Sequence, residues 1–359
     1  MPEPIRVLCV FSTLDRGGAE SMCMNLYRHI DRNKVQFDFV KHTPKKGSFE
    51  DEISALGGRV FEAPRLKPES ILKYYIWWKK HLISHPEHRI IHGHFFTISP
   101  AYFFIAKIYK RITIGHIHVT KANRLSKAII AKFISALTDY PLACSQAAGK
   151  WVYGNRPFIV LNNSIDTNKY CANSNIAEKI RKDFELGKDL VIGSVGRFEL
   201  QKNPYGILEI FRLVQKKRPG CKLLWVGDGS LKQEMVKKAN ELGLKKQVIF
   251  TGVRDDVDCL LQAMDAFIMP SFYEGLPVAA IEAQVAGIKC FISDAVTDEV
   301  VITPNCEMIP LDDYEKWALM ISKLEANSKH PDMKKIIINA GYDIRTSSEW
   351  LADFYLSLV

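Results

Sequence analysis

Two carboxylates, Glu274 and Glu282, are separated by seven residues and enclose the start of a predicted helix. The apolar run 266–270 predicts a buried strand, Pro277 is expected at the first helical position, and Gly287 lies just past the helix end. At about 1.5 Å per residue, Glu282 lies roughly 7 to 8 Å beyond the helix start. This spacing predicts two carboxylates on one crevice. The alternative is that both are ordinary solvated glutamates.

The loop before this helix supplies backbone donors as well. The N–H groups of Gly275, Leu276 and Val278 belong to the loop and the first helical turn, where a helix offers them no internal acceptor. Such N–H groups bind anions or sugar hydroxyls. We therefore expect the loop that contains Gly275, Leu276 and Pro277 to contact a ligand.

A second loop of this kind carries two cations. A predicted strand at 189–195 is followed by Arg197 and Lys202, and then by Asn203 and Pro204, which suit the N-cap and the first position of a helix. Two cations beside a helix N-terminus can clamp a diphosphate. The alternative is two solvated basic residues.

The amino-terminal segment has a third loop between a strand and a helix. A predicted strand at 5–11 leads to Gly17 and Gly18 and then to a helix that ends near residue 29. Glycines in this position let backbone amides approach an anion, although a plain tight turn explains them equally well.

Two His-x-His pairs each end a predicted strand, His92 with His94 and His116 with His118. This position is the rim of the crevice in which open α/β sheets bind ligands. Each pair lacks a nearby Cys or acidic third ligand, so we expect no metal site. Buried structural histidines are the alternative for each residue.

The basic residues are unevenly distributed. Residues 1–170 hold 25 Lys and Arg against 13 Asp and Glu, although the whole chain has a net charge of +9. This asymmetry indicates an acidic partner, such as nucleic acid or an anionic membrane. Aromatics and cations alternate at 73–80 and 102–111, where the aromatics are either core residues or part of a surface that rests on anionic lipid. No nucleic-acid-binding signature is present, so we expect no nucleic acid partner.

Cysteine usage and hydropathy indicate a cytoplasmic protein. The eight cysteines are scattered without a Cys-x-x-Cys pair. No charged leader precedes an apolar segment, and no apolar run is long enough to cross a bilayer. If a membrane is involved, we expect the protein to lie on its cytoplasmic face.

The order of predicted elements gives the fold class. Strands and helices alternate through the 359 residues, which are too many for one ordinary core. We expect an α/β protein with two domains and parallel sheets. The polar stretch 168–175 is expected to be a surface linker.

The Glu-x7-Glu spacing around Glu-Gly-Leu-Pro resembles the nucleotide-sugar site of retaining glycosyltransferases of family 4, which have the GT-B fold. That resemblance covers most of the chain and implies two Rossmann-like domains, residues 1–165 and 166–344, whose sheets face each other across a cleft. The last segment, 345–359, would return to the first domain as a helix opened by a capping box at Thr346–Glu349.

The resemblance also implies roles for the residues above. Glu274 and the backbone N–H groups of the loop that contains Gly275, Leu276 and Pro277 would hold the sugar, and Glu282 would hold the ribose hydroxyls. Arg197 and Lys202 would neutralise the leaving diphosphate, toward which the loop of Gly17 and Gly18 reaches.

Two further roles follow from the same resemblance. Arg254 lies where the family contacts the base. His116 and His118 are both candidates for the histidine beside the anomeric carbon.

Asn163-Ser164 stands where the family usually has Asn-Gly in the turn between domains, and Ser tolerates a positive φ less well than Gly.

The resemblance implies a metal-independent transferase without a bound cofactor. Its substrates would be a nucleotide-sugar donor, commonly a UDP-sugar, and a saccharide acceptor, linked to a lipid diphosphate in bacterial exopolysaccharide or capsule assembly. A GT-B-shaped UDP-sugar epimerase and a non-catalytic nucleotide-sugar-binding protein are the alternatives. The run Gly227-Asp228-Gly229 begins a dinucleotide-binding motif, but Lys232 occupies the place of its last glycine, which argues against an oxidoreductase.

Overall fold

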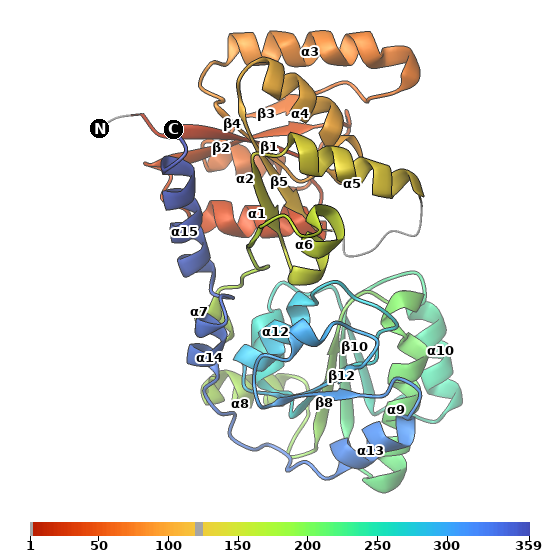
Figure 1. Cartoon of the computed structure of the whole chain (residues 1–359). Helices are drawn as coiled ribbons and strands as arrows, with labels where there is room; N and C mark the ends of the chain where they lie inside the picture. Colours follow the sequence, from red (N-terminus) through yellow and green to blue (C-terminus); the bar gives the residue numbers. More distant parts are fainter. Residues whose placement is uncertain (1–2, 119–124) are drawn as a thin grey trace. The chain divides into compact units, whose positions relative to one another are not determined.

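All strand pairings of the described residues, 3–118 and 125–359, are parallel in the computed structural model of the chain (Figure 1). The strands form two sheets, one with seven strands and one with six. Helices occupy most of the intervening segments. The predicted α/β class with two parallel sheets is therefore confirmed.

The chain divides into two compact units. Unit 1 comprises Met1–Ser164 and Gly341–Val359, and unit 2 comprises Ile165–Ala340. The boundaries predicted from the sequence lie at 165/166 and 344/345. Each unit contains one of the two sheets.

Unit 1 begins with a strand and ends with the last helix of the chain. Its elements are β1 Ile5–Val10, α1 Gly18–His29, β2 Val35–Lys41, α2 Glu50–Ala55, β3 Val60–Glu62, α3 Ile71–Ser84, β4 Ile90–Gly93, α4 Ser99–Ile108, β5 Ile112–Ile117, α5 Leu125–Leu137, β6 Tyr140–Ala143, α6 Gln146–Tyr153, β7 Ile159–Val160 and α15 Ile344–Leu356.

Unit 2 begins with two short helices. Its elements are α7 Thr167–Tyr170, α8 Ser174–Asp183, β8 Val191–Val195, α9 Pro204–Lys217, β9 Lys222–Val226, α10 Lys232–Glu241, β10 Val248–Gly252, α11 Val257–Gln262, β11 Ala266–Met269, α12 Val278–Val285, β12 Lys289–Ser293, β13 Cys306–Ile309, α13 Tyr314–Ser322 and α14 Lys334–Asn339.

Both sheets reverse their strand order at one point. The order is β3-β2-β1-β4-β5-β6-β7 in unit 1 and β10-β9-β8-β11-β12-β13 in unit 2. The reversal lies between β1 and β4 in the first sheet and between β8 and β11 in the second. Open parallel sheets bind ligands beside the carboxyl ends of the strands at such a switch point.

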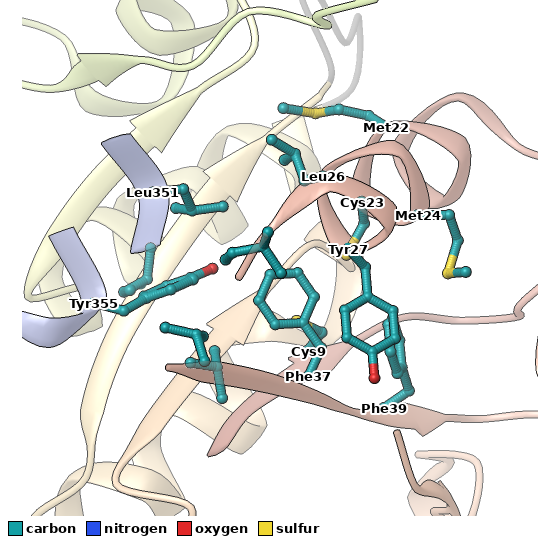
Figure 2. Packing of buried hydrophobic residues seen from close by; sticks show 14 of the residues in the cluster. Cys9, Met22, Cys23, Met24, Leu26, Tyr27, Phe37, Phe39, Leu351 and Tyr355 are labelled. Carbon is teal, nitrogen blue, oxygen red and sulfur yellow. The ribbon is translucent and has the colours of Figure 1, made fainter. Parts of the chain in front are cut away.

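The core of unit 1 has two layers because successive strand residues face opposite sides of a sheet. Val7 and Cys9 of β1 pack with α1, α2 and α15, whereas Leu8 and Val10 pack with α3, α4, α5 and α6. Figure 2 shows Tyr355 of α15 beside residues of the first layer, to which the carboxyl-terminal helix therefore contributes.

The aromatic side chains of the second layer settle one open question. Tyr74, Trp78, Tyr102 and Phe103, from the stretches in which aromatics alternate with cations, are fully buried. For these four residues the core interpretation holds.

The start of α15 differs from the prediction. The helix begins at Ile344, because the carboxylate of Asp343 accepts the N–H groups of Arg345 and Thr346 at 3.1 and 3.3 Å. An aspartate at the N-cap satisfies these donors before the predicted capping box can do so. The predicted capping box was therefore wrong, because Thr346 and Glu349 lie inside the helix.

Ser164, which takes the place of a glycine in the family's turn, is buried. Its hydroxyl lies 2.6 Å from the hydroxyl of Ser347 in α15 and also donates to the carbonyl of Gly341. Ser164 is not among the residues with positive φ. The turn therefore needs no glycine, and the serine side chain connects the segment after β7 to α15 within unit 1.

Two expectations for unit 2 were wrong. The stretch 168–175 is not a linker, because it contains most of α7 and the start of α8, where Asn173 caps the helix. Strand β13 was not predicted. It has four residues, of which Glu307 and Met308 are partly exposed, so its apolar pattern is too short and irregular to identify an edge strand.

Unit 1 contains a buried network of charged side chains beside its sheet. Asp38 of β2 is fully buried and pairs with Arg6 at 2.6 Å, Arg59 at 2.6 Å and His88 at 2.8 Å. Burial alone would raise the pKa of Asp38, but the hydrogen bonds from Arg6, His88 and Arg59 lower it. The carboxylate is therefore held in its ionised form.

His81 lies beside this network and is neutral. Its Nε2 lies 3.1 Å from Nδ1 of His88, and its ring stacks on Trp77. Burial, together with the nearby His88 and His85, lowers the pKa of His81 to about 3. Burial also lowers the pKa of His88 and His42.

Unit 1 is therefore predicted to lose stability in mild acid. In the unfolded chain a histidine has a pKa of about 6.5 and binds a proton at mildly acidic pH, whereas the same histidine in the folded chain stays neutral. The unfolding free energy is therefore unaffected above pH 6.5 and decreases as the pH falls toward 3. At pH 5 His81, whose folded pKa is about 3, costs about 2 kcal/mol of unfolding free energy, and His88 and His42 act in the same direction. Urea unfolding at pH 7.5 and 5.0 measures this loss.

The two units serve as controls for each other, because nine of the ten histidines lie in unit 1 and only His330 lies in unit 2. Pulsed thiol labelling with peptide mass spectrometry follows them separately. The buried thiols of unit 1 include Cys9 and Cys23, and those of unit 2 include Cys290 and Cys306. Equal acid sensitivity of the two sets would contradict the prediction.

Candidate functional site

The switch point of unit 2 brings together most of the predicted site. The loop after β8 contains Arg197 and Lys202, and the loop after β11 contains Glu274 and Gly275. Because β8 and β11 are adjacent, both loops leave the same part of the sheet edge. The helices that follow, α9 and α12, begin at this edge.

The loop after β8 is held by the loop after β9. The N–H of Phe198 donates to the carbonyl of Asp228 at 3.0 Å, and the N–H of Leu231 donates to the carbonyl of Phe198 at 3.0 Å. A Cβ added to Gly227 would lie 2.0 Å from the carbonyl oxygen of Gly196. Glycine is therefore required for the two backbones to approach each other.

Helix α9 starts as the sequence predicts. Asn203 is the N-cap, and its side-chain oxygen accepts the N–H of Gly206 at 3.0 Å, with Pro204 at the first helical position. Asn203 has a φ of 52°, and its amide also donates to the hydroxyl of Tyr314. A non-glycine residue in this conformation is strained unless its surroundings hold it.

Helix α12 starts one residue later than predicted. Pro277 has φ −77° and ψ 104°, so it is the N-cap and the helix begins at Val278. Its extended ψ places it outside the helix, whereas the fixed φ of proline suits either position. Gly275 is exposed, and Leu276 and Pro277 are buried beneath the loop.

Lys202 and Glu274 form an ion pair across the two loops. Nζ of Lys202 lies 2.6 Å from Oε1 of Glu274, without the angles of a hydrogen bond. Gln201 joins the same loops, because its side-chain amide donates to the carbonyl of Tyr273 and to Oε2 of Glu274, at 3.0 and 3.3 Å. The predicted cation and the predicted sugar-binding carboxylate are therefore held together.

Ser271 is a residue of this site that the sequence analysis missed. It is fully buried between the loops, and its hydroxyl has no hydrogen-bond partner among the described residues. It lines a small cavity with Ser194, Arg197 and Lys202. Serine at the end of a strand is too common to have been singled out in the sequence.

Glu282, the second predicted carboxylate, is paired with a residue from α7. Tyr170 forms a side-chain hydrogen bond with Glu282, and Lys169 lies close enough to stabilise its charge. Burial raises the pKa of Glu282, and these two neighbours oppose that shift. Lys169 also pairs with Asp258 at 3.2 Å. The sequence analysis missed Tyr170 because it assigned its segment to a linker.

The two predicted arginines lie on the surface of unit 2. Arg197 is exposed. Arg254, just after β10, makes a two-pronged ion pair with Asp256, with nitrogen–oxygen distances of 2.8 and 2.6 Å. The pair fixes the guanidinium of Arg254 at the same edge of the sheet as Arg197.

The remaining predicted residues lie in unit 1. Gly17 is the N-cap of α1, and Gly18 is the first residue of the helix. A Cβ added to Gly18 would meet nothing within 4 Å. His116 is buried in β5, and His118, just past the strand, is half-buried. These four residues lie at the carboxyl edge of the first sheet, near the β1–β4 switch point.

Known proteins resemble this chain over nearly its whole length. The sequence model of a family described as "Glycosyl transferases group 1" matches residues 176–343. A putative glycosyltransferase, EpsF, of Bacillus subtilis is 29% identical over 98% of this chain and 96% of its own. The capsular polysaccharide biosynthesis glycosyltransferase CapH of Staphylococcus aureus is 26% identical over 98% of this chain and 99% of its own.

Two other likenesses concern substrates. A UDP-Gal:alpha-D-GlcNAc-diphosphoundecaprenol alpha-1,3-galactosyltransferase of Escherichia coli is 26% identical over 56% of this chain and 54% of its own. The crystal structure of Anabaena Alr3699/HepE in complex with UDP superposes with a TM-score of 0.79, at 18% identity, over 99% of this chain and all of that one. The same protein has also been solved with UDP-glucose. The structural likeness confirms the predicted GT-B fold.

The contact between Gly227 and Gly196 predicts a specific loss of stability. Gly227→Ala should lower the unfolding free energy by about 1–2 kcal/mol through its positive φ, and by about 1–3 kcal/mol more through the overlap with the Gly196 carbonyl. Urea unfolding of the purified variant measures the sum.

Gly220→Ala is the matched control. Gly220 also has a positive φ, but an added Cβ would meet only a carboxylate oxygen of Asp189, at 3.8 Å. This control should show the conformational cost alone. Equal losses in the two variants would contradict the role assigned to the close backbone contact.

Proposed function

We propose that this chain, a glycosyltransferase of the GT-B fold, is a retaining and metal-independent enzyme of family 4. It transfers a hexose or N-acetylhexosamine from a UDP-sugar to a lipid-linked saccharide acceptor, in exopolysaccharide or capsule assembly. The name of CapH supports the polysaccharide pathway, that of EpsF supports a glycosyltransferase, and the UDP-bound structures of HepE support the donor.

The observation that carries this proposal is the ion pair of Lys202 and Glu274 at the β8–β11 switch point. A diphosphate needs cations and helix N-termini, and a sugar needs a carboxylate for its hydroxyls. Lys202 and Arg197 stand beside the start of α9, and Glu274 stands before the start of α12. The two requirements meet within one unit of the chain.

The other predicted residues take complementary roles. We assign the ribose hydroxyls to Glu282, whose carboxylate Tyr170 orients, and the base to the region of Arg254. The backbone of Gly275 and Leu276 is assigned to the sugar. Gly17 and Gly18 are assigned to the diphosphate, and His116 and His118 stay alternative candidates for contact with the sugar.

The reaction breaks the bond between the anomeric carbon and the donor phosphate oxygen, and forms a bond from the same carbon to the acceptor oxygen. In the retaining route that we propose, the departing phosphate accepts the proton of the acceptor hydroxyl. The main requirement is then to stabilise the negative charge that grows on the diphosphate, which preorganised cations do effectively. Arg197 and Lys202 supply that stabilisation, so no protein nucleophile is needed.

We assign the binding of the acceptor and the contact with a membrane to unit 1. Exposed apolar side chains lie on three neighbouring helices that cover one side of the first sheet, namely Ile71, Leu72, Ile76 and Ile83 of α3, Phe104 and Ile108 of α4, and Ile129 and Phe133 of α5. Leu72 is 71% exposed, and it lines an apolar groove of about 580 Å³ with Phe104. We call this surface the apolar face.

Lysines border the apolar face. Exposed lysines on the same helices include Lys73, Lys79, Lys80, Lys127 and Lys132. None of the helices in the described ranges 3–118 and 125–359 combines the length and hydropathy that a bilayer span requires. The combination of apolar and basic residues suits a protein that rests on anionic lipid, and the E. coli relative named above acts on a lipid diphosphate.

Lys202→Ala should abolish most of the transferase activity. Removing one charge from a preorganised clamp raises the barrier by about 2.7–4 kcal/mol, a loss of roughly a hundredfold to a thousandfold in turnover. The assay uses the purified chain, a panel of UDP-, GDP-, ADP- and TDP-sugars, and a diphosphoundecaprenol-linked saccharide, with the product identified by mass spectrometry and NMR.

Lys289→Ala is the matched control, because Lys289 also pairs with a glutamate, Glu307, but at the opposite end of the strands in unit 2. It should keep its activity. Wild-type turnover by the Lys202 variant would overturn the role of the clamp. An isomerised nucleotide sugar would instead identify an epimerase, and nucleotide binding without any product would identify a non-catalytic protein.

Leu72→Glu should weaken membrane binding. Loss of one apolar side chain from the lipid costs about 1.5–3 kcal/mol, so the partition coefficient should fall roughly tenfold to a hundredfold. Sedimentation with vesicles of phosphatidylglycerol and phosphatidylethanolamine measures it at low salt. Leu319→Glu, an exposed leucine of α13 in unit 2, is the control and should bind as the wild type does. Equal binding of both variants would exclude the apolar face.

A further inference from the structure

Ser271 lies inside the candidate site, but the function proposed above gives it no role. It follows β11 and is 0% exposed. Its hydroxyl has no hydrogen-bond partner within the described part of the chain. A buried hydroxyl without a partner destabilises a folded protein, because it has lost its water and gained nothing in return. The presence of this serine therefore calls for an explanation other than stability.

The small cavity that Ser271 lines has room for about one water-sized group. Its volume is about 10 Å³. The other polar side chains that line it are those of Ser194, Arg197 and Lys202, and the rest of the lining is mostly apolar. Among the described residues no carboxylate lines the cavity. The cavity therefore combines two positive charges with two hydroxyls.

This set of groups selects an anionic oxygen as the occupant. The side chains of lysine and arginine can only donate hydrogen bonds, and a serine hydroxyl can donate one as well. A negatively charged oxygen with several lone pairs can accept from all of them, and such charge-assisted hydrogen bonds are the strong ones. A non-bridging phosphate oxygen has this charge and is about as large as the oxygen of a water molecule.

We propose that Ser271 binds the leaving phosphate of the donor. Its hydroxyl donates a hydrogen bond to a non-bridging oxygen of the phosphate that carries the sugar. This inference rests on the proposed function, in which Arg197 and Lys202 bind the diphosphate. The hydrogen bond from Ser271 strengthens as negative charge grows on that phosphate, because the hydroxyl is fixed before the reaction begins.

The backbone holds Ser271 beside Lys202. The N–H of the next residue, Phe272, donates to the carbonyl of Gln201 at 2.9 Å, so the loops after β8 and β11 are joined at this point. A Cβ added to Gly196 would lie 3.4 Å from Cε of Lys202, which shows that the lysine side chain runs along Gly196 at the cavity wall. The hydroxyl and the cation are therefore in place before a donor binds.

The ion pair of Lys202 and Glu274 is compatible with this role. In the chain without ligand the lysine is paired at 2.6 Å, whereas the hydroxyl of Ser271 is left over. When a donor binds, Lys202 can turn to the diphosphate and Ser271 gains its partner. The serine has already lost its water on folding, so its hydrogen bond to the phosphate carries no further desolvation cost on the side of the protein.

The test compares UDP with UMP, which lacks the phosphate that would carry the sugar. Isothermal titration calorimetry with the full chain measures both dissociation constants. Ser271→Ala should raise the Kd of UDP roughly tenfold to a hundredfold, the range expected for loss of a hydrogen bond to a charged group. The Kd of UMP should stay unchanged.

Stability without ligand separates this role from a structural one. Ser271→Ala removes an unpaired buried hydroxyl, so its unfolding free energy in urea should equal or exceed that of the wild type. Ser293→Ala is the matched control. Ser293 is also fully buried and ends the neighbouring strand β12, but its hydroxyl accepts the N–H of Ala295 at 3.0 Å. This control should lose stability and bind UDP as the wild type does.

Equal UDP affinity of the wild type and Ser271→Ala would overturn the proposal and leave the cavity to a water molecule. Equal losses with UDP and UMP would also overturn it, because the hydroxyl would then serve the other phosphate. Lower stability of Ser271→Ala without ligand would indicate a structural partner instead. If this variant does not fold, Ser271→Cys keeps the volume with a weaker donor and should still raise the Kd of UDP alone.

Failure of the proposed donor gives a different result. A wild type that binds GDP, ADP or TDP in place of UDP would contradict the UDP-sugar, and the same comparison with the matching monophosphate would then test Ser271. A folded wild type that binds none of these diphosphates would contradict both proposals.

Discussion

The reversal of strand order between β8 and β11 is the constraint on which the rest of unit 2 depends. Helix α9 packs with α10 and α13 on one side of the sheet, whereas α12 packs against α7 and the neighbouring strands β11 and β12. The loops that lead to α9 and α12 therefore separate at the sheet edge, and two helix N-termini are left beside each other. Any anion that binds there meets backbone donors from both helices. The charges of Lys202 and Glu274 add selectivity to a position that the topology already defines.

The ion pair between these two residues has a consequence for ligand binding. Each charge is partly buried, and a partly buried charge without a partner is unfavourable. In the chain without substrate the two charges satisfy each other, and Gln201 holds the loops at the right separation. A nucleotide sugar then exchanges one set of partners for another, because its diphosphate can accept the lysine and its hydroxyls can donate to the carboxylate. The strained Asn203 and the glycine contact beneath the loop keep Lys202 at the start of α9.

Local signals in the sequence predicted the parts of this site that depend on local structure. Most of the strands, the N-cap at Asn203 and the class of fold follow from periodicity and capping, and the structure confirms them. The partner of Glu282 could not be predicted, since Tyr170 lies in a polar segment whose helix is stabilised by packing against α12 rather than by its own pattern. The start of α15 was misplaced because Asp343 and Thr346 offer competing caps, and only the packing of the buried Ile344 decides between them. Contacts between residues at the ends of neighbouring strands can be predicted only when the order of the strands is known. No single segment of the sequence gives that order.

The histidines of unit 1 also show that the sequence alone does not reveal which side chains neighbouring strands bring together. A spacing of two residues places His92 and His94 on one face of their strand, and the sequence analysis recognised this for each pair. The register of β4 on β5 places the second pair beside the first, so a set of four side chains arises from two incomplete ones. A parallel sheet collects the ends of its strands along one edge, and the chemistry at that edge belongs to neighbouring strands together. Strand order therefore carries functional information that motif spacing along the chain does not.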